Sequence, residues 1–192
     1  RAMTRRKKAM TVGLALAVLL TAVALTGCSL LPFGRPSGKT GEDPVTPGPG
    51  QGEMVLRLYF GDKQAMFLLP EDRTVTAPAG KTYEQLVVEE LITGPKLADQ
   101  VRTIPPEAKL LSLEIVEGVA YVNFSIEIQT KHWGGSTGEL FTIYSIVNSL
   151  TESPNVTAVQ FLIEGKRVES LVGHVDATKP IERNADMISG GK

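Results

Sequence analysis

The chain has 192 residues, of which 42% are hydrophobic and 21% charged, and its formal net charge is −1. This length predicts one medium-sized domain with additional segments, and the balanced charge argues against a generally basic nucleic-acid-binding protein. The single cysteine excludes a disulfide framework, and two histidines leave little room for a multi-histidine metal centre. We therefore expect no metal and no cofactor.

The first 27 residues have the composition of an export signal. They contain no acidic residue and these basic ones: Arg1, Arg5, Arg6, Lys7 and Lys8. An uncharged apolar stretch from Met10 to Leu25 follows, with the modest length of a secretory signal. The segment Leu25-Thr26-Gly27-Cys28 resembles a bacterial lipobox, which implies lipidation of Cys28 after cleavage. The alternative is an uncleaved membrane helix with an incidental cysteine.

Cleavage before Cys28 would leave an acidic chain, because all 21 acidic residues of the protein follow this position. Such a chain is not drawn to anionic lipid by its net charge, so the lipid on Cys28 would supply the membrane attachment. The lipobox thus implies anchoring to the outer face of the bacterial cytoplasmic membrane.

A proline- and glycine-rich segment separates this anchor from the folded part. Residues 29–52 contain too little apolar surface to fold and predict a linker. The expected organisation is a signal peptide at 1–27, a lipidated cysteine and linker at 28–52, a domain at 53–184 and a tail at 185–192.

Short alternating runs begin at Glu53. The pattern predicts a half-buried strand at Met54–Phe60, a turn at Gly61-Asp62-Lys63 and a second strand at Ala65–Leu69. A third extended piece is expected at Arg73–Ala77. The first part of the domain is therefore expected to be extended.

Two helices are predicted from capping boxes. Thr82-x-x-Gln85 begins the first helix, which Gly94-Pro95 ends. Ser136-x-x-Glu139 begins the second, whose apolar residues extend to Leu150 at helical spacing.

Three further strands are predicted around these helices. Leu110–Val116 and Val119–Phe124 flank the turn Glu117-Gly118, and Val156–Ile163 is followed by the turn Glu164-Gly165. The order of elements predicts an α+β domain, a two-layer sandwich in which two helices cover one face of an antiparallel or mixed sheet.

Motifs spread over the whole domain resemble the GerMN domain family. They are Leu58-Tyr59-Phe60, Gly94-Pro95, Ile104-Pro105 before Leu110-Leu111-Ser112, Gly138-Glu139-Leu140, Ile143 to Thr151, Gly173-His174 and Pro180 to Asn184. The resemblance implies a lipoprotein of sporulation or spore germination with a fold like that of ring-building envelope modules. It implies envelope proteins as partners and carries over no catalytic residue, so we expect no enzyme.

The segment Gly134-Gly135-Ser136-Thr137-Gly138 also satisfies the Gly-x-Ser-x-Gly pattern of hydrolases, and Glu164 or Glu169 before His174 gives a suitable chain order. A nucleophilic serine would need a strained turn in a parallel sheet, which the hairpins argue against. We expect Ser136 to cap the helix instead.

A cell-wall protein is the alternative function. Glu127, Glu139 and Asp176 are candidates for a carboxylate pair that cleaves peptidoglycan, although nothing in the sequence establishes their separation or a raised pKa. His132-Trp133 could form a loop that stacks on sugar or binds a partner; alternatively, Trp133 plugs a sheet edge while His132 is solvated.

An open sheet face is the other candidate for partner binding. Arg57, Tyr59, Tyr121 and Asn123 alternate with core positions, and two helices cannot cover both faces of a sheet of five or six strands. We expect these four side chains on one outer face, where exposed tyrosines suit a recognition surface. An ordinary solvated face is the alternative.

Overall fold

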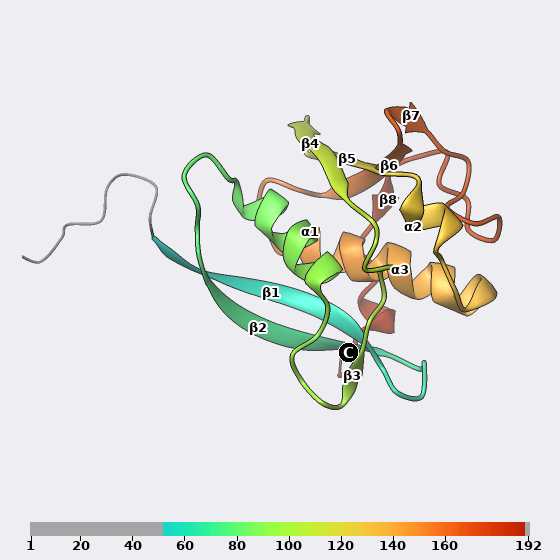
Figure 1. The fold of residues 1–192 in the computed structure, drawn as a ribbon, viewed down its shortest axis with the longest axis horizontal. Coiled ribbons are helices and arrows are strands. Elements are labelled where there is room, and N and C mark those ends of the chain that lie inside the picture. Colours follow the sequence, from blue (N-terminus) through green and yellow to red (C-terminus); the bar gives the residue numbers. More distant parts are fainter. Residues whose placement is uncertain (1–51, 191–192) are drawn as a thin grey trace, which may run out of the picture. The chain divides into compact units, whose positions relative to one another are not determined.

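The computed structural model describes residues 52–190, which form two β-sheets and two longer helices (Figure 1). The expected signal peptide, the expected lipidation site Cys28 and the expected linker up to residue 51 lie outside the described residues. The elements are β1 (Glu53–Asp62), β2 (Leu68–Thr76), α1 (Tyr83–Thr93), β3 (Gln100–Val101), β4 (Leu110–Val116), β5 (Val119–Phe124), α2 (Glu127–Thr130), α3 (Gly135–Leu150), β6 (Ala158–Ile163), β7 (Lys166–Arg167), β8 (Ile181–Glu182) and a 3-10 turn (Ala185–Met187).

The first hairpin forms a small sheet with the strand order β2-β1-β3. The expected extended pieces at 65–69 and 73–77 prove to be one strand, β2, because the hairpin loop is longer than predicted. The Asp62 carboxylate accepts the N–H groups of Met66 and Phe67 at 2.7 and 3.0 Å and holds this loop.

The second sheet has the order β4-β5-β6-β7, with β8 also paired to β6. It is mixed, because β4 and β5 are antiparallel whereas β5 and β6 are parallel. The predicted turn Glu117-Gly118 joins β4 to β5, and both residues have the positive φ (50° and 81°) of a two-residue hairpin turn. The predicted turn at Glu164-Gly165 has the same conformation.

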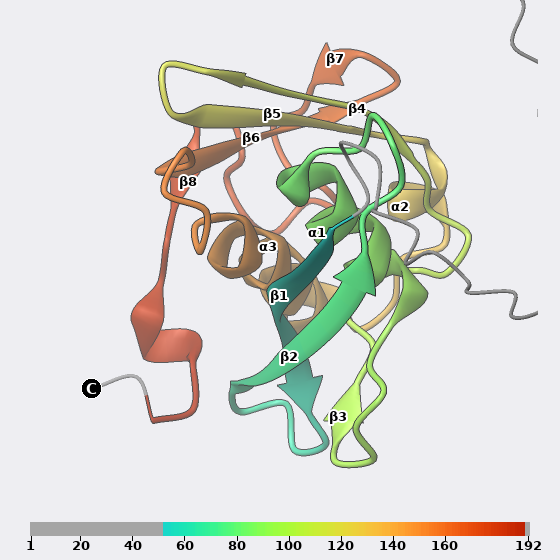
Figure 2. The same cartoon turned by 90° about the vertical axis from the view of Figure 1, so that its left-hand side faces the viewer.

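Both long helices lie between the two sheets (Figure 2). They share one core with the strands, in which Phe60 of β1, Leu91 of α1, Ile146 of α3 and Phe161 of β6 are fully buried. The α+β class is therefore confirmed, and the expected mixed sheet with two helices on one face is the second sheet. The first hairpin is not part of that sheet but covers the other side of the helices.

Helix α3 can lie against β1 because two small polar side chains face that strand. The Ser149 hydroxyl oxygen accepts the N–H of Tyr59 at 3.0 Å, and the Ser145 hydroxyl donates to the Tyr59 carbonyl at 2.6 Å. These serines hydrogen-bond backbone groups of β1 that no neighbouring strand pairs. They attach α3 to the edge of β1 that β2 leaves free.

The start of α1 follows the predicted capping box. Thr82 Oγ1 accepts the N–H of Gln85 at 3.2 Å, and the Gln85 side chain accepts the N–H of Thr82 at 3.1 Å. Gly94 ends the helix with φ 93°, a conformation that glycine adopts without steric cost. Both ends of α1 are thus confirmed.

Residues 181–189, here called the C-terminal strap, begin with β8 on the second sheet and continue along β1 and β2 of the first sheet. The side-chain amide of Asn148 in α3 holds the strap by two hydrogen bonds to the backbone of Asn184. It donates to the Asn184 carbonyl at 2.9 Å and accepts the Asn184 N–H at 3.0 Å. Farther on, Ile188 forms a bridge to Leu68, and the Ser189 N–H donates to the Leu68 carbonyl at 2.9 Å. Residues beyond the expected domain boundary at 184 therefore contribute to the fold.

Candidate functional site

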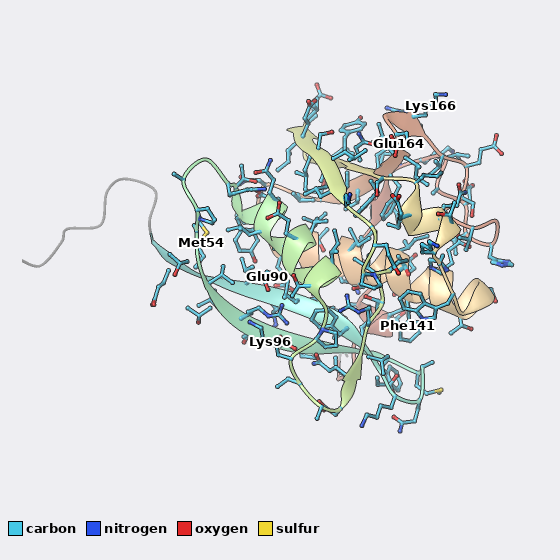
Figure 3. All side chains as sticks on the ribbon, viewed as in Figure 1. Met54, Glu90, Lys96, Phe141, Glu164 and Lys166 are labelled. Atoms are coloured by element: carbon cyan, nitrogen blue, oxygen red, sulfur yellow. The ribbon has the colours of Figure 1, made fainter. Side chains whose placement is uncertain are left out.

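A groove of about 430 Å³ lies where the end of β1, β3 and the start of α3 meet. Its walls include these side chains: Asp62, Val101, Thr103, Trp133, Thr137 and Phe141. Figure 3 labels Phe141, which projects from α3. The walls are more apolar than polar, so the groove is suited to an apolar or amphipathic group.

Three glycines keep this region open. A Cβ atom at Gly61 would lie 3.1 Å from side-chain atoms of Phe141 and Val101, and one at Gly138 would lie 2.3 Å from the Trp133 carbonyl oxygen. Gly134 has φ 90°, which turns the chain from Trp133 into α3. Glycine at these positions therefore permits the close approach that shapes the groove.

Trp133 forms one wall of the groove and is 47% exposed. Its ring is stacked on His132, with 6.2 Å between the ring centroids. His132 is half-buried, and its Nε2 lies 2.9 Å from Thr142 Oγ1. His132 is thus partly buried and bonded to α3, and Trp133 presents an aromatic surface beside the groove.

Burial lowers the pKa of His132, and the nearby His174 lowers it further, while Glu139 acts in the opposite direction. The imidazole is therefore neutral at pH 7. It therefore packs beside Trp133 as a neutral ring rather than as a cation.

The N-terminus of α3 differs from the prediction. The helix begins at Gly135, its N-cap is Gly134, and no side chain caps it. Ser136 lies inside the first turn and is exposed, so the expected capping box with Glu139 is wrong. Ser136 also does not occupy a strand-to-helix turn, the position that the hydrolase pattern requires.

Glu139 is fully buried and serves another purpose. Its carboxylate accepts the Ser170 hydroxyl at 2.5 Å and the N–H groups of Val172 and His174 at 2.9 and 2.8 Å. Burial raises the pKa of Glu139, but these hydrogen bonds outweigh it and lower the pKa overall. A glycosidase acid needs a raised pKa, so Glu139 is unsuited to that role.

Tyr121 and Asn123 lie on the outward face of β5, as expected. They border a shallow hollow of about 280 Å³ with Ser112, Glu114, Leu162 and Gly165. The Arg167 guanidinium lies 5.5 Å from the centroid of the Tyr121 ring, and Asn123 Oδ1 accepts the Gly165 N–H at 2.8 Å. Both side chains are thus half-buried and partly engaged.

Arg57 and Tyr59 do not join this face, because β1 and β5 belong to different sheets. Arg57 is exposed and lies 3.7 Å from the Asp72 carboxylate. Tyr59 is only 4% exposed, so its expected position on an open surface is wrong. Its hydroxyl donates to Glu152 at 2.6 Å and accepts from Arg183 of the C-terminal strap at 3.0 Å.

Sequence reasoning found Trp133 but missed the opposite walls of the groove. Val101 and Thr103 lie in a segment without a periodic pattern, and Phe141 had the spacing of a core residue. The glycine pair at 134 and 138 is the signal that could have indicated a close approach.

Two findings concern metal binding and membrane insertion. Across residues 52–190, no group of three or more His, Cys, Asp or Glu side chains is placed to hold a metal ion. No helix in the same range combines the length and the apolar character needed to span a bilayer.

Solved structures with a similar fold were found by comparison. The tandem GerMN domains of the sporulation protein GerM from Bacillus subtilis match with a TM-score of 0.56 and 21% identity, over 77% of this chain and 51% of that one. The first GerMN domain of the same protein matches with a TM-score of 0.55 and 19% identity, over 68% and 98%. This chain therefore spans about half of the tandem protein, and no curated protein matches it.

A sequence model of one family, described as "Germane: Sporulation and spore germination", matches residues 57–169. The match covers more than half of the chain and includes every wall of the groove, but neither Cys28 nor the C-terminal strap. Together with the shared fold, it shows that this chain belongs to the Germane family of sporulation and spore germination domains.

Proposed function

We propose that this protein is a membrane-anchored, non-catalytic interaction module of the bacterial envelope that acts in sporulation or germination. In this proposal the groove beside Trp133 receives an apolar side chain of a partner envelope protein. The lipid on Cys28 holds the module at the membrane, and the linker lets the groove reach its partner.

The observation that carries the proposal is the half-exposed Trp133 beside the groove. Large aromatic side chains at the rim of an apolar hollow are frequent anchors of protein interfaces. The neighbouring His132 ring restricts the motion of Trp133, which reduces the entropy that binding would otherwise cost.

The absence of catalysis is proposed from the state of the candidate groups. Glu139 is held by hydrogen bonds with a lowered pKa, and Ser136 lies exposed in a helical turn. Neither arrangement activates a general acid or a nucleophile. The family description names a developmental process and no reaction.

Photo-crosslinking in sporulating cells tests the groove. A photoreactive amino acid at Thr137, an exposed groove residue, should capture a partner protein, whereas the same group at the exposed Lys179 should not. Trp133→Ala should abolish the capture from position 137 while circular dichroism stays unchanged. Equal capture from both positions, or capture insensitive to Trp133→Ala, would reject the groove as the contact site.

Anchoring has a separate test. Cys28→Ala should abolish incorporation of labelled fatty acid and release the protein from the membrane fraction. Normal labelling of this variant would show that Cys28 is not the lipidation site.

Peptidoglycan binding is the second candidate function, because an exposed tryptophan face also stacks on sugar rings. Purified protein would then pellet with cell-wall sacculi, and Trp133→Ala would prevent pelleting. Release of muropeptides would instead indicate a hydrolase and contradict the non-catalytic proposal.

A further inference from the structure

Strand β4 differs from the other free sheet edges among the described residues. The strands β3, β7 and β8 have two residues each. β2 presents exposed Pro70, Asp72 and Thr74, and the C-terminal strap covers its Leu68 end. Short strands, proline and polar side chains are common ways of protecting an edge from pairing.

By contrast, β4 has seven residues, Leu110–Val116, with one charge and no lysine or proline. Three of its apolar side chains are exposed: Leu111 by 48%, Ile115 by 37% and Val116 by 51%. Among residues 52–190, no backbone group of Leu111–Val116 is hydrogen-bonded to any element other than β5. The border of the second sheet that β4 forms is therefore open (Figures 1 and 2).

The hairpin determines which backbone groups of β4 are free. In a two-residue hairpin the two residues that flank the turn, here Val116 and Val119, form a hydrogen-bonded pair. Hydrogen-bonded and non-hydrogen-bonded pairs then alternate along the two strands. Glu114 and Ser112 thus bond β5, whereas Leu113 and Ile115 direct their N–H and C=O groups away from the sheet. An added strand would have to bond these two residues.

We propose that the occupant of this edge is a second copy of the same chain. The β4 strands of the two copies pair antiparallel about a twofold axis at Leu113. This pairing joins the second sheet of one copy to the second sheet of the other. In this register the free groups of Leu113 meet those of its copy. Leu111 lies opposite Ile115 at the end of the regular pairing. Lys109 follows beyond the bulge, where its long side chain can reach Glu117 of the other copy. The edge is therefore complementary to itself in apolar character and, at its ends, in charge.

Neighbouring registers are less favourable. An axis at Glu114 would place two glutamates directly opposite each other, which destabilises a strand pair. An axis at Ser112 would bring the bulge at Leu111 next to the axis in both strands and Glu117 near Glu107. A twofold axis midway between two adjacent residues would place the free N–H and C=O groups of one copy opposite groups of the other copy that already bond to β5.

The expected dimer is weak in dilute solution. Regular pairing ends at the bulge at Leu111, so the contact is well below the roughly 800 Å² per partner of stable interfaces. Tethering of both copies to one membrane would raise their effective concentration and favour pairing. Only this dependence on the membrane rests on the proposed function; the register of the strands does not.

Disulfide trapping with the full-length chain in lipid vesicles tests the register. Ser112 and Glu114 of two copies would form a non-hydrogen-bonded pair, whose Cα atoms lie about 4.5 Å apart, within disulfide range. Both side chains are exposed, so Ser112→Cys and Glu114→Cys should fold normally. A mixture of the two variants should form the bridged dimer at about tenfold higher yield than either variant alone.

Matched controls separate this dimer from chance collisions. The unsubstituted chain reports any disulfide-linked dimer that forms through Cys28. The variant Thr74→Cys on β2 should give no more disulfide-linked dimer than this chain. Lys109→Glu or Glu117→Lys alone should lower the yield of the mixture about threefold, and the double reversal should restore it. Equal yields from the mixture and the single variants, or no restoration by the double reversal, would overturn the proposal.

Discussion

At the scale of single residues, Glu139 shows how a buried charge can organise a loop. Its oxygens accept one hydroxyl and the backbone N–H groups of Val172 and His174, which fixes residues 170–174 against α3. Since hydrogen bonds to a charged acceptor are stronger than neutral ones, this loop depends on the ionised carboxylate.

We predict that Glu139→Gln lowers the free energy of unfolding by about 1–3 kcal/mol at pH 7, because an amide nitrogen then faces N–H donors. The lowered pKa of Glu139 makes this contribution fully present above about pH 4.3, the ordinary glutamate value, and lost as the pH falls through the folded value. Urea unfolding at several pH values measures both effects.

The control for this variant is Glu169→Gln, since Glu169 is exposed on the same loop. Its effect should stay within about 0.5 kcal/mol. A wild-type advantage over Glu139→Gln that persists unchanged in strong acid would show that the charge is not its source.

Tyr59 is the residue where sequence reasoning failed most clearly. Its strand phase indicated an outward position, but Phe141 of α3 packs against it, and Arg183, 124 positions along the chain, covers it. A periodic pattern reports which face a side chain occupies and carries no information about a distant segment that later covers that face.

Tyr59→Phe should therefore reduce the free energy of unfolding by about 1 kcal/mol, because Glu152 and Arg183 lose a hydrogen-bond partner. Tyr121→Phe, on the outward face of β5, should have almost no effect. Chemical denaturation of both variants checks the contrast, and equal losses would contradict the buried network.

At the scale of elements, the two helix starts give a matched pair. Thr82→Ala should cost about 0.5–2 kcal/mol, because Thr82 caps α1. Ser136→Ala should cost less than about 0.5 kcal/mol, because Ser136 caps nothing. Urea midpoints of the two variants decide this, and a larger loss for Ser136→Ala would restore the capping box that the structure lacks.

Local signals predicted the elements well, since turns, glycine helix ends and the first capping box depend on neighbouring residues. They could not assign the first hairpin to a sheet of its own, because an amphipathic strand can cover either side of a helix layer. Ser145 and Ser149 were the available clue: small polar residues inside an apolar helix indicate a backbone packed closely against it. For the same reason only one wall of the groove could be predicted. Trp133 stands out in the sequence, whereas Val101 is brought to the groove only by the tertiary fold.

At the scale of the whole molecule, the C-terminal strap joins parts of the chain that are distant in sequence. Arg183 stacks over the Tyr59 ring at 5.4 Å and donates to Glu152 and to the Asn148 carbonyl at 2.7 and 2.8 Å. It thereby ties the end of the domain to α3 and to the first sheet.

Arg183→Ala should lower the free energy of unfolding by about 1–3 kcal/mol through the loss of these charge-assisted bonds. Arg167→Ala is the matched control, because Arg167 also lies over a tyrosine ring, at 5.5 Å, but makes only a long bond of 3.5 Å. We expect it to cost about 0.5 kcal/mol. Thermal unfolding of both variants measures the difference, and equal losses would indicate that only the ring contact matters.

The strap also sets the order in which the domain can fold. Its contacts with β1 close a loop of more than a hundred residues, and such distant pairings slow folding because the chain must first be brought together. A growing chain that ends before Arg183 leaves Tyr59, Leu68 and Phe141 without their cover of Met187 and Ile188. Folding is therefore complete only after synthesis of the domain, and chains arrested near residue 170 should remain sensitive to protease.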